Sequence, residues 1–131
     1  MPKFILRVTG YLSLILLVSM LIDYASAEVS GDWTYTVTDN QATITKYSGS
    51  DTEIVVPSTL EGLEVVDLGG DEGMVFFTNG SSPMGIEKVT ISEGIKTIGD
   101  YAFQSHSSSF EVIIPESVRE IEQWAFFITA G

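Results

Sequence analysis

A 23-residue repeat constrains the fold of this chain more than any other feature. Residues 89–103 recur as residues 112–126, and every apolar position of the first copy is apolar in the second, while most positions between them change. A period in the twenties with a fixed apolar pattern is typical of a solenoid, in which a rung buries its inner face only by stacking on the next. The sequence therefore predicts a mainly β fold: a short solenoid of parallel strands with 3₁₀ or helical turns.

The N-terminal residues 1–27 have the composition of a secretory signal peptide. Lys3 and Arg7 precede a mostly apolar run, residues 8–22, and small residues follow at 25–27. The run is shorter than the roughly 20 residues that span a bilayer, which favours a cleaved signal over a membrane anchor. We expect residues 28–131 to form a single domain, either secreted or associated with the cell surface.

The charge of this domain restricts its partners. Residues 28–131 contain 4 basic and 17 acidic residues, a formal net charge of −13. Such a surface repels phosphate groups, and its few cations are scattered, so we expect neither nucleic acid nor an anionic membrane as a partner. The chain has no cysteine, so its apolar core must hold it without disulfides, and thiol catalysis and cysteine metal sites are excluded.

The segment before the repeats predicts a cap. Polar and apolar residues alternate on both sides of Asp39–Asn40, two residue types that tolerate positive φ. We therefore expect a β-hairpin over residues 31–50, turning at this pair and covering the open face of the first rung.

A degenerate copy of the repeat follows the hairpin. Its Pro57 aligns with Ser92 and Pro115, five extra residues lie near Gly62, and the pattern dissolves after Gly69. The apolar residues 74–77 are expected to stand in for the Ala–Phe pair of the good copies. The domain then divides into the cap and three copies: 31–50, 53–85, 86–108 and 109–131.

Aligning the copies predicts which side chains stack. Consecutive rungs of parallel strands place equivalent residues in contact, about 4.8 Å apart. One outward ladder should place a lysine between two carboxylates: Glu53, Lys88 and Glu111. Four inward rows are expected: Ile54–Val89–Val112, Val56–Ile91–Ile114, Val65–Ile95–Val118 and Leu68–Ile98–Ile121.

The apolar spacing of residues 86–103, which ends in Gly99, Ala102 and Phe103, resembles the BspA-type leucine-rich repeat of bacterial surface and secreted proteins. The chain departs from that pattern at His106, where the family usually has cysteine, and at Ser109, where it has leucine. The resemblance implies a leucine-rich-repeat-like solenoid that acts through an interaction surface, in adhesion or in binding host or matrix proteins. It carries over no catalytic residue.

The polar residues that could carry chemistry favour structural interpretations. His106 is the only histidine, so a second histidine for a catalytic or zinc site is missing. The spacing of acidic residues in the degenerate copy differs from that of calcium loops, and those of the last copy are expected on its outward face. We therefore predict no catalytic residue, metal ligand or cofactor from these carboxylates: Asp67, Asp71, Glu72, Glu116, Glu120 and Glu122.

Several aromatic residues are candidates for contacts with protein or sugar, because they supply contact area at low entropic cost. Packing is the favoured interpretation: the first two would close the cap, and Trp124 would pack beside Phe126. Residues 79–81 form a glycosylation sequon that matters only in a glycosylating host. The candidates are Trp33, Tyr35, Tyr47, Tyr101 and Trp124.

These observations predict a non-catalytic domain that binds an extracellular or host protein, or a glycan. Two alternatives stay open: a small secreted carbohydrate-active or other hydrolytic enzyme, which would need two facing carboxylates, and a fragment of a longer repeat protein with a scaffold role. The apolar residues 126–131 leave one end of the solenoid uncovered. They predict truncation, a partner at that end, or self-association through it.

Overall fold

The computed structural model describes residues 25–69, 74–76, 85–104 and 110–127, and these contain ten strands and no helix. Residues 1–24, most of the expected signal peptide, lie outside the described residues. In the described part of the chain, no helix is long and apolar enough to cross a membrane. The strands are β1 (Glu28–Ser30), β2 (Trp33–Thr38), β3 (Gln41–Tyr47), β4 (Glu53–Val56), β5 (Thr59–Leu60), β6 (Leu63–Leu68), β7 (Lys88–Ile91), β8 (Thr97–Ile98), β9 (Glu111–Ile113) and β10 (Glu120–Ile121).

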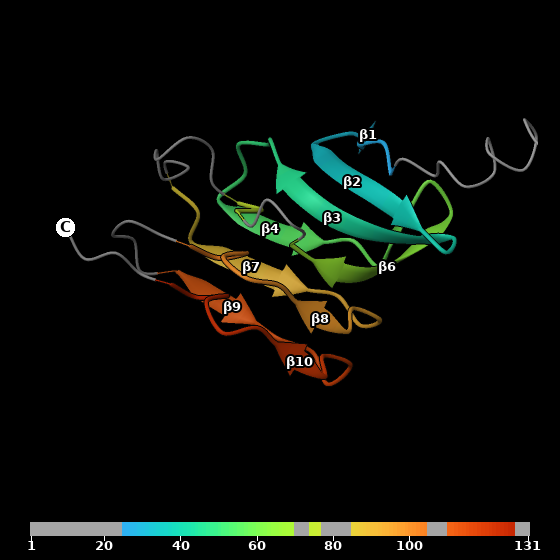
Figure 1. Cartoon of the computed structure of the whole chain (residues 1–131). Helices are drawn as coiled ribbons and strands as arrows, with labels where there is room; N and C mark the ends of the chain where they lie inside the picture. Colours follow the sequence, from blue (N-terminus) through green and yellow to red (C-terminus); the bar gives the residue numbers. More distant parts are fainter. Residues whose placement is uncertain (1–24, 70–73, 77–84, 105–109, 128–131) are drawn as a thin grey trace, which may run out of the picture.

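Strands β4, β7 and β9 form a three-stranded parallel sheet along one side of the molecule (Figure 1). Lys88 on β7 pairs with Glu53 on β4 and with Glu111 on β9. Equivalent residues of successive copies are therefore direct neighbours, as the repeat requires. The register confirms the outward charge ladder, the inward row Ile54–Val89–Val112 and the pairing of Val56 with Ile91.

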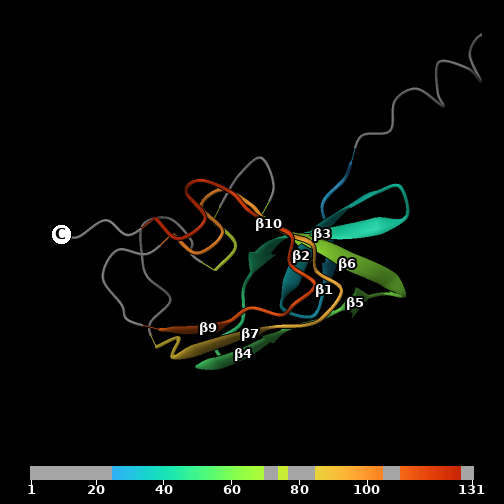
Figure 2. The same ribbon diagram turned by 90° about the horizontal axis from the view of Figure 1, so that it is seen from below.

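A second sheet contains the later strand of each copy, in the order β1-β2-β3-β6-β8-β10, with β5 paired to β6. Ile98 on β8 pairs with Leu68 on β6 and with Ile121 on β10, which confirms a further predicted row. Each copy thus gives one strand to each sheet, and Figure 2 shows β4, β7 and β9 overlapping along one side of the coil. The expected solenoid of parallel strands is the observed fold.

The predicted cap is present, with one additional strand. Strands β2 and β3 pair in antiparallel orientation, and the turn residues Asp39 and Asn40 have φ values of 51° and 62°. The short strand β1 extends this hairpin, and β3 pairs in parallel with β6. The cap therefore continues the second sheet beyond the first rung, and a three-residue edge strand ends it.

The extra residues of the degenerate copy form a small hairpin. Glu61 and Gly62 have φ values of 48° and 83°, and they form the two-residue turn that connects the antiparallel strands β5 and β6. Both positions of such a turn require positive φ. The insertion thus projects from the rung without changing the register between rungs, because Leu68 still pairs with Ile98.

A ladder of aromatic rings runs along the inside of the turns. Phe76 stacks on Phe103 with ring centroids 4.8 Å apart, and Phe103 stacks on Phe126 at 5.0 Å with an interplanar angle of 4°. Val75 and Phe76 are 0% and 2% exposed. They take the place of the Ala–Phe pair, as the sequence predicts for this segment, and the ladder reaches the cap through the contact of Phe76 with Tyr47.

The turns of the rungs differ from the prediction. Ala102 N donates to Gly99 O at 3.3 Å, and Ala125 N donates to Glu122 O at 3.2 Å. These are single turns with hydrogen bonds between residues three apart, and in the described residues they do not extend into 3₁₀ or α-helix.

Candidate binding surface

The last rung exposes the side chains that the preceding rung buries. We call the described part of this copy, residues 110–127, the terminal rung. Its apolar residues follow the same pattern as those one repeat earlier, but no further rung covers them in the described structure. The exposed fractions of equivalent pairs are 2% for Ile91 and 40% for Ile114, 0% for Ile98 and 48% for Ile121, and 1% for Phe103 and 38% for Phe126.

This exposure corrects one part of the predicted core. Ile114 and Ile121 were expected to face inward, and Ile121 does pair with Ile98 in register. Both nevertheless remain substantially exposed, since an inward position in a solenoid is buried only by a rung on each side. In the described part of the chain, the exposed apolar surface therefore extends beyond the residues 126–131 that the sequence indicated. Residues 128–131 lie outside the described residues.

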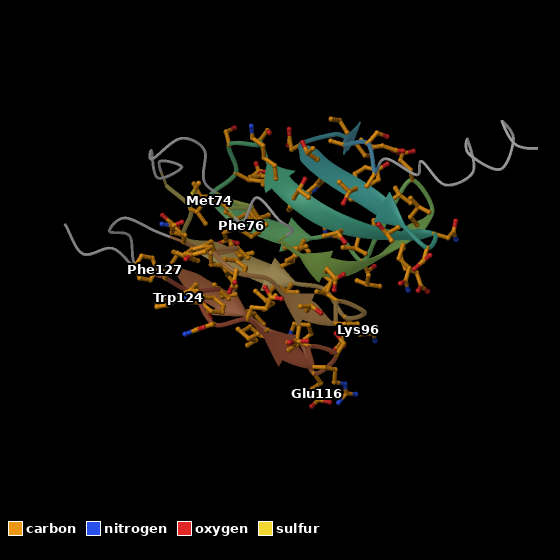
Figure 3. The ribbon with its side chains drawn as sticks, viewed as in Figure 1. Met74, Phe76, Lys96, Glu116, Trp124 and Phe127 are labelled. Carbon is orange, nitrogen blue, oxygen red and sulfur yellow. The ribbon has the colours of Figure 1, made fainter. Side chains whose placement is uncertain are left out.

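Three aromatic residues gather at the turn end of the terminal rung. The ring of Phe127 lies edge-on to Trp124 at 5.4 Å and to Tyr101 at 6.2 Å. Figure 3 shows Trp124 and Phe127 side by side there. Trp124 thus packs against Phe127, where the sequence suggested Phe126, and 41% of its surface remains exposed. Tyr101 is 37% exposed.

Two carboxylates fix the backbone beneath this aromatic group. Glu122 Oε2 accepts a hydrogen bond from Asp100 N at 2.7 Å, and Asp100 Oδ1 accepts one from Trp124 N at 3.1 Å. Both acidic side chains therefore hold the two turns together. Neither is arranged as one of the two free, facing carboxylates that a glycoside hydrolase uses.

The apolar surface of the terminal rung has an acidic border. Glu116 lies at the end of the rung opposite the aromatic group (Figure 3). Glu111 approaches Lys88 with 3.9 Å between Oε2 and Nζ, and 65% of its side chain is exposed. The rung thus combines apolar and aromatic area with an excess of negative charge, carried by Glu111, Glu116, Glu120 and Glu122 against Arg119.

The aromatic candidates of the cap serve packing. Tyr35 is 1% exposed and donates to Glu28 Oε2 at 3.2 Å. Trp33 packs against Tyr47 with centroids 4.7 Å apart and against Phe76 at 6.3 Å. These contacts bear out the packing interpretation for the cap, so the exposed aromatic residues of interest are those of the terminal rung.

The polar candidates form no catalytic or metal-binding cluster in the described part of the chain. His106, Asp71, Glu72 and the sequon at residues 79–81 lie outside the described residues. Asp67 Oδ2 accepts a hydrogen bond from Thr43 Oγ1 at 3.5 Å. Among the described residues, no group of three or more histidine, aspartate or glutamate side chains could hold a metal ion.

Comparison with known proteins shows what the repeats are similar to. Residues 77–130 match the family described as BspA type leucine rich repeat region (6 copies). Among solved structures, a leucine rich cell surface protein from Faecalibacterium prausnitzii A2-165 is 20% identical, with a TM-score of 0.31, over 79% of this chain. The chain spans 46% of the length of that structure. No curated protein matches the chain significantly.

Proposed function

Because residues 77–130 match the BspA-type leucine-rich repeats, we propose that this chain is a non-catalytic binding module that recognises an extracellular or host protein through its terminal rung. The observation that carries the proposal is the contrast between rungs. Ile121 and Phe126 are 48% and 38% exposed, whereas their equivalents one repeat earlier are buried. A cluster of exposed large apolar residues on one end of a soluble domain marks an interaction site.

The composition of the surface supports a protein partner. Trp and Tyr are enriched among the residues that dominate binding energy, and Trp124 and Tyr101 are both exposed beside Phe127. Their backbone is held by the hydrogen bonds of Asp100 and Glu122. A rigid aromatic group loses little entropy on binding.

We place this module outside the cell, either secreted or at the cell surface. Two features support the location: the signal-like residues 1–27, and the match of residues 77–130 to BspA-type repeats, whose resemblance implies a surface or secreted protein. N-terminal sequencing of the exported protein tests it. Glu28 is the expected first residue, and retention of residues 1–27 in the exported protein would contradict a cleaved signal.

The binding proposal is tested with residues 28–131, because every described strand lies within this segment. Binding to an array of host extracellular and matrix proteins is compared for the wild type and the double variant Ile121→Ser/Trp124→Ser. We expect the variant to lose binding at least tenfold, since about 1–3 kcal/mol is lost with each buried anchor.

Val29→Ser is the matched control, since Val29 is 70% exposed on β1, at the cap end. It should bind as the wild type does, and circular dichroism should show all three proteins folded. Binding that survives in the double variant, or an array with no bound protein, would contradict the proposal.

A further inference from the structure

We infer that the outer edge of β9, which no other described strand covers, receives an extended, cationic segment of the partner, which adds a fourth strand to the sheet β4-β7-β9. The inference rests on the proposed function and names the chemistry of the partner. It starts from the strand order, in which β9 is the last strand of this sheet among the residues that the structure describes. Extended peptides commonly bind by adding a strand to such an edge.

The backbone of β9 is prepared for this addition. Glu111 N donates to Glu87 O of the preceding rung at 2.9 Å, so this N–H points away from the outer edge of the sheet. In a parallel ladder the bonding groups alternate between the two sides of a strand, so the neighbouring N–H of Val112 points toward the open edge. An incoming strand would find the same hydrogen-bonding pattern that β7 offers to β9.

The outward ladder specifies the charge of the incoming residue. Its order is Glu53, Lys88, Glu111, so negative and positive side chains alternate along neighbouring positions. Opposite charges on directly paired residues are favourable, and like charges are unfavourable. The next position beyond Glu111 therefore calls for lysine or arginine, and the net formal charge of −12 on the whole chain attracts the same kind of segment.

The apolar positions of the edge specify the rest of the segment. Ile113 and Ile114 are each 40% exposed, on opposite faces of the strand end, and Phe126 is 38% exposed nearby in the same rung. A strand that pairs with β9 would cover both isoleucines with its own alternating side chains. The pattern that fits is the one found in β7, a cation followed by apolar and β-branched residues.

Charge argues against a second copy as the occupant, although self-association was an expectation of the sequence. The two edge strands of this sheet are β4 and β9, and they carry Glu53 and Glu111 at equivalent positions. Parallel pairing of β9 with either edge of another copy, in the register of this sheet, would set carboxylate against carboxylate. Like charges at directly opposed positions destabilise a strand pair.

The edge of β9 is favoured over that of β4 because the inward side chains differ. Ile54 and Val56 on β4 are 3% and 0% exposed, so β4 leaves little inner apolar area for a new strand to cover. Ile114 on the terminal rung is exposed. The binding site is therefore expected at one end of the sheet only.

The test uses a fluorescent, acetylated peptide, Lys-Val-Thr-Ile-Lys-Val-Thr-Ile, and residues 28–131. Anisotropy should show binding that weakens as salt is raised, since surface charge pairs are screened. Replacing both lysines of the peptide by glutamate should weaken binding about tenfold or more. N-methylation of alternate peptide amides should abolish it, because the backbone pairing is lost.

Protein variants locate the site. Glu111→Lys should reverse the preference, so that the glutamate peptide binds better than the lysine peptide. Glu53→Lys, the matched change at the other edge, should leave binding unchanged. Equal affinity for the two peptides, insensitivity to N-methylation, or a loss with Glu53→Lys and none with Glu111→Lys would overturn the inference.

Sedimentation of residues 28–131 without peptide tests whether a second copy of the chain occupies the edge of β9. A dimer that Ile114→Ser dissociates would show that another copy occupies the edge and would overturn the inference. Failure of the lysine peptide is distinguishable from failure of the proposed function. In that case a protein on the array would still bind in a manner sensitive to Ile121→Ser/Trp124→Ser, whereas failure of both experiments would reject both proposals.

Discussion

Single glycines decide how closely neighbouring rungs approach. Gly69 has a φ of +112°, and a Cβ placed there would lie 3.0 Å from the Cα of Gly99 in the next rung. Real Cβ atoms rarely come this close to backbone atoms, which cannot rotate away. The third copy has Glu122 at this position, at the outer side of the stack, where the carboxylate instead reaches back to Asp100 N.

Gly69→Ala should therefore lower the free energy of unfolding more than Gly94→Ala, which has similar backbone strain but no crowding. Gly94 is the matched control, since its φ is +106° and a Cβ there meets nothing within 4 Å. We expect about 1–2 kcal/mol of destabilisation from the positive φ in both variants, and a further 1–3 kcal/mol or so from crowding in Gly69→Ala. Urea unfolding measures the difference, and equal values would show that the glycine contact is relaxed at little cost.

The phenol of Tyr47 links the stability of the cap to alkaline pH. Its hydroxyl donates to Asp51 Oδ2 at 3.3 Å, and burial is the largest cause that raises its pKa above the ordinary value, with the nearby carboxylates of Asp51 and Asp32 adding to it. The unfolded state therefore loses this proton first. Stability from this group is complete below the ordinary pKa of about 10 and declines as pH rises through the raised pKa.

Tyr47→Phe should remove this part of the alkaline decline. At neutral pH the variant should lose about 0.5–1.5 kcal/mol with the hydrogen bond to Asp51. As the pH rises above the ordinary pKa of about 10, its free energy of unfolding should fall less steeply than that of the wild type. Tyr101→Phe, on an exposed ring, serves as the control, and parallel curves for Tyr47→Phe and the wild type would contradict the prediction.

At the scale of elements, the aromatic ladder connects the cap to the terminal rung. Phe103 occupies its middle, 1% exposed, with Phe76 on one side and Phe126 on the other. Phe126, at the end of the ladder, has a stacked neighbour on one side only in the described structure. Position along the ladder, rather than residue type, should set the cost of losing a ring.

Phe103→Ala should destabilise the chain by about 3–5 kcal/mol, because it removes a fully buried ring and its stacking contacts with Phe76, Phe110 and Phe126. Phe126→Ala should cost only about 1–2 kcal/mol, since a large part of that ring is already in water. Thermal unfolding followed by circular dichroism compares the two. Equal losses would mean that the ring of Phe126 is covered in solution, which points to association through the terminal rung.

The elements differ in how far the sequence predicted them. The repeat rows and the hairpin at Asp39–Asn40 followed from periodicity and turn chemistry. Strands β1 and β5 did not, since they have three and two residues and carry no periodic signal of their own. Their pairing depends on an existing neighbour, β2 or β6. The residue pair Glu61–Gly62 between Leu60 and Leu63 was the signal that could have revealed the β5–β6 turn.

At the scale of the whole molecule, a solenoid is a stack in which each rung is stabilised by its neighbours. The cap covers one end, and the terminal rung has a neighbour on one side only in the described structure (Figure 1). Unfolding should therefore begin at β9 and β10. The same asymmetry places the candidate binding surface at the least stable end of the domain, where a partner would stabilise it.

Hydrogen exchange tests this gradient. The amide of Gly99, which donates to Leu68 O at 2.6 Å, should exchange much more slowly than that of Glu122, which donates to Ile98 O at 2.9 Å one rung later. Local opening of the terminal rung, rather than global unfolding, should control the second rate. Equal protection would show that the rungs open together, and addition of a bound partner should slow exchange at Glu122 selectively.

The sequence by itself determined the architecture, because a 23-residue period of apolar residues has a stable solution only if equivalent residues stack. It also indicated a cap and the alternation of charge at Glu53, Lys88 and Glu111. Only the tertiary structure decided which of these apolar residues are buried. Ile98 and Ile121 occupy the same position of the repeat, yet one lies between two rungs and the other has a rung on one side only, and burial depends on that number of neighbours.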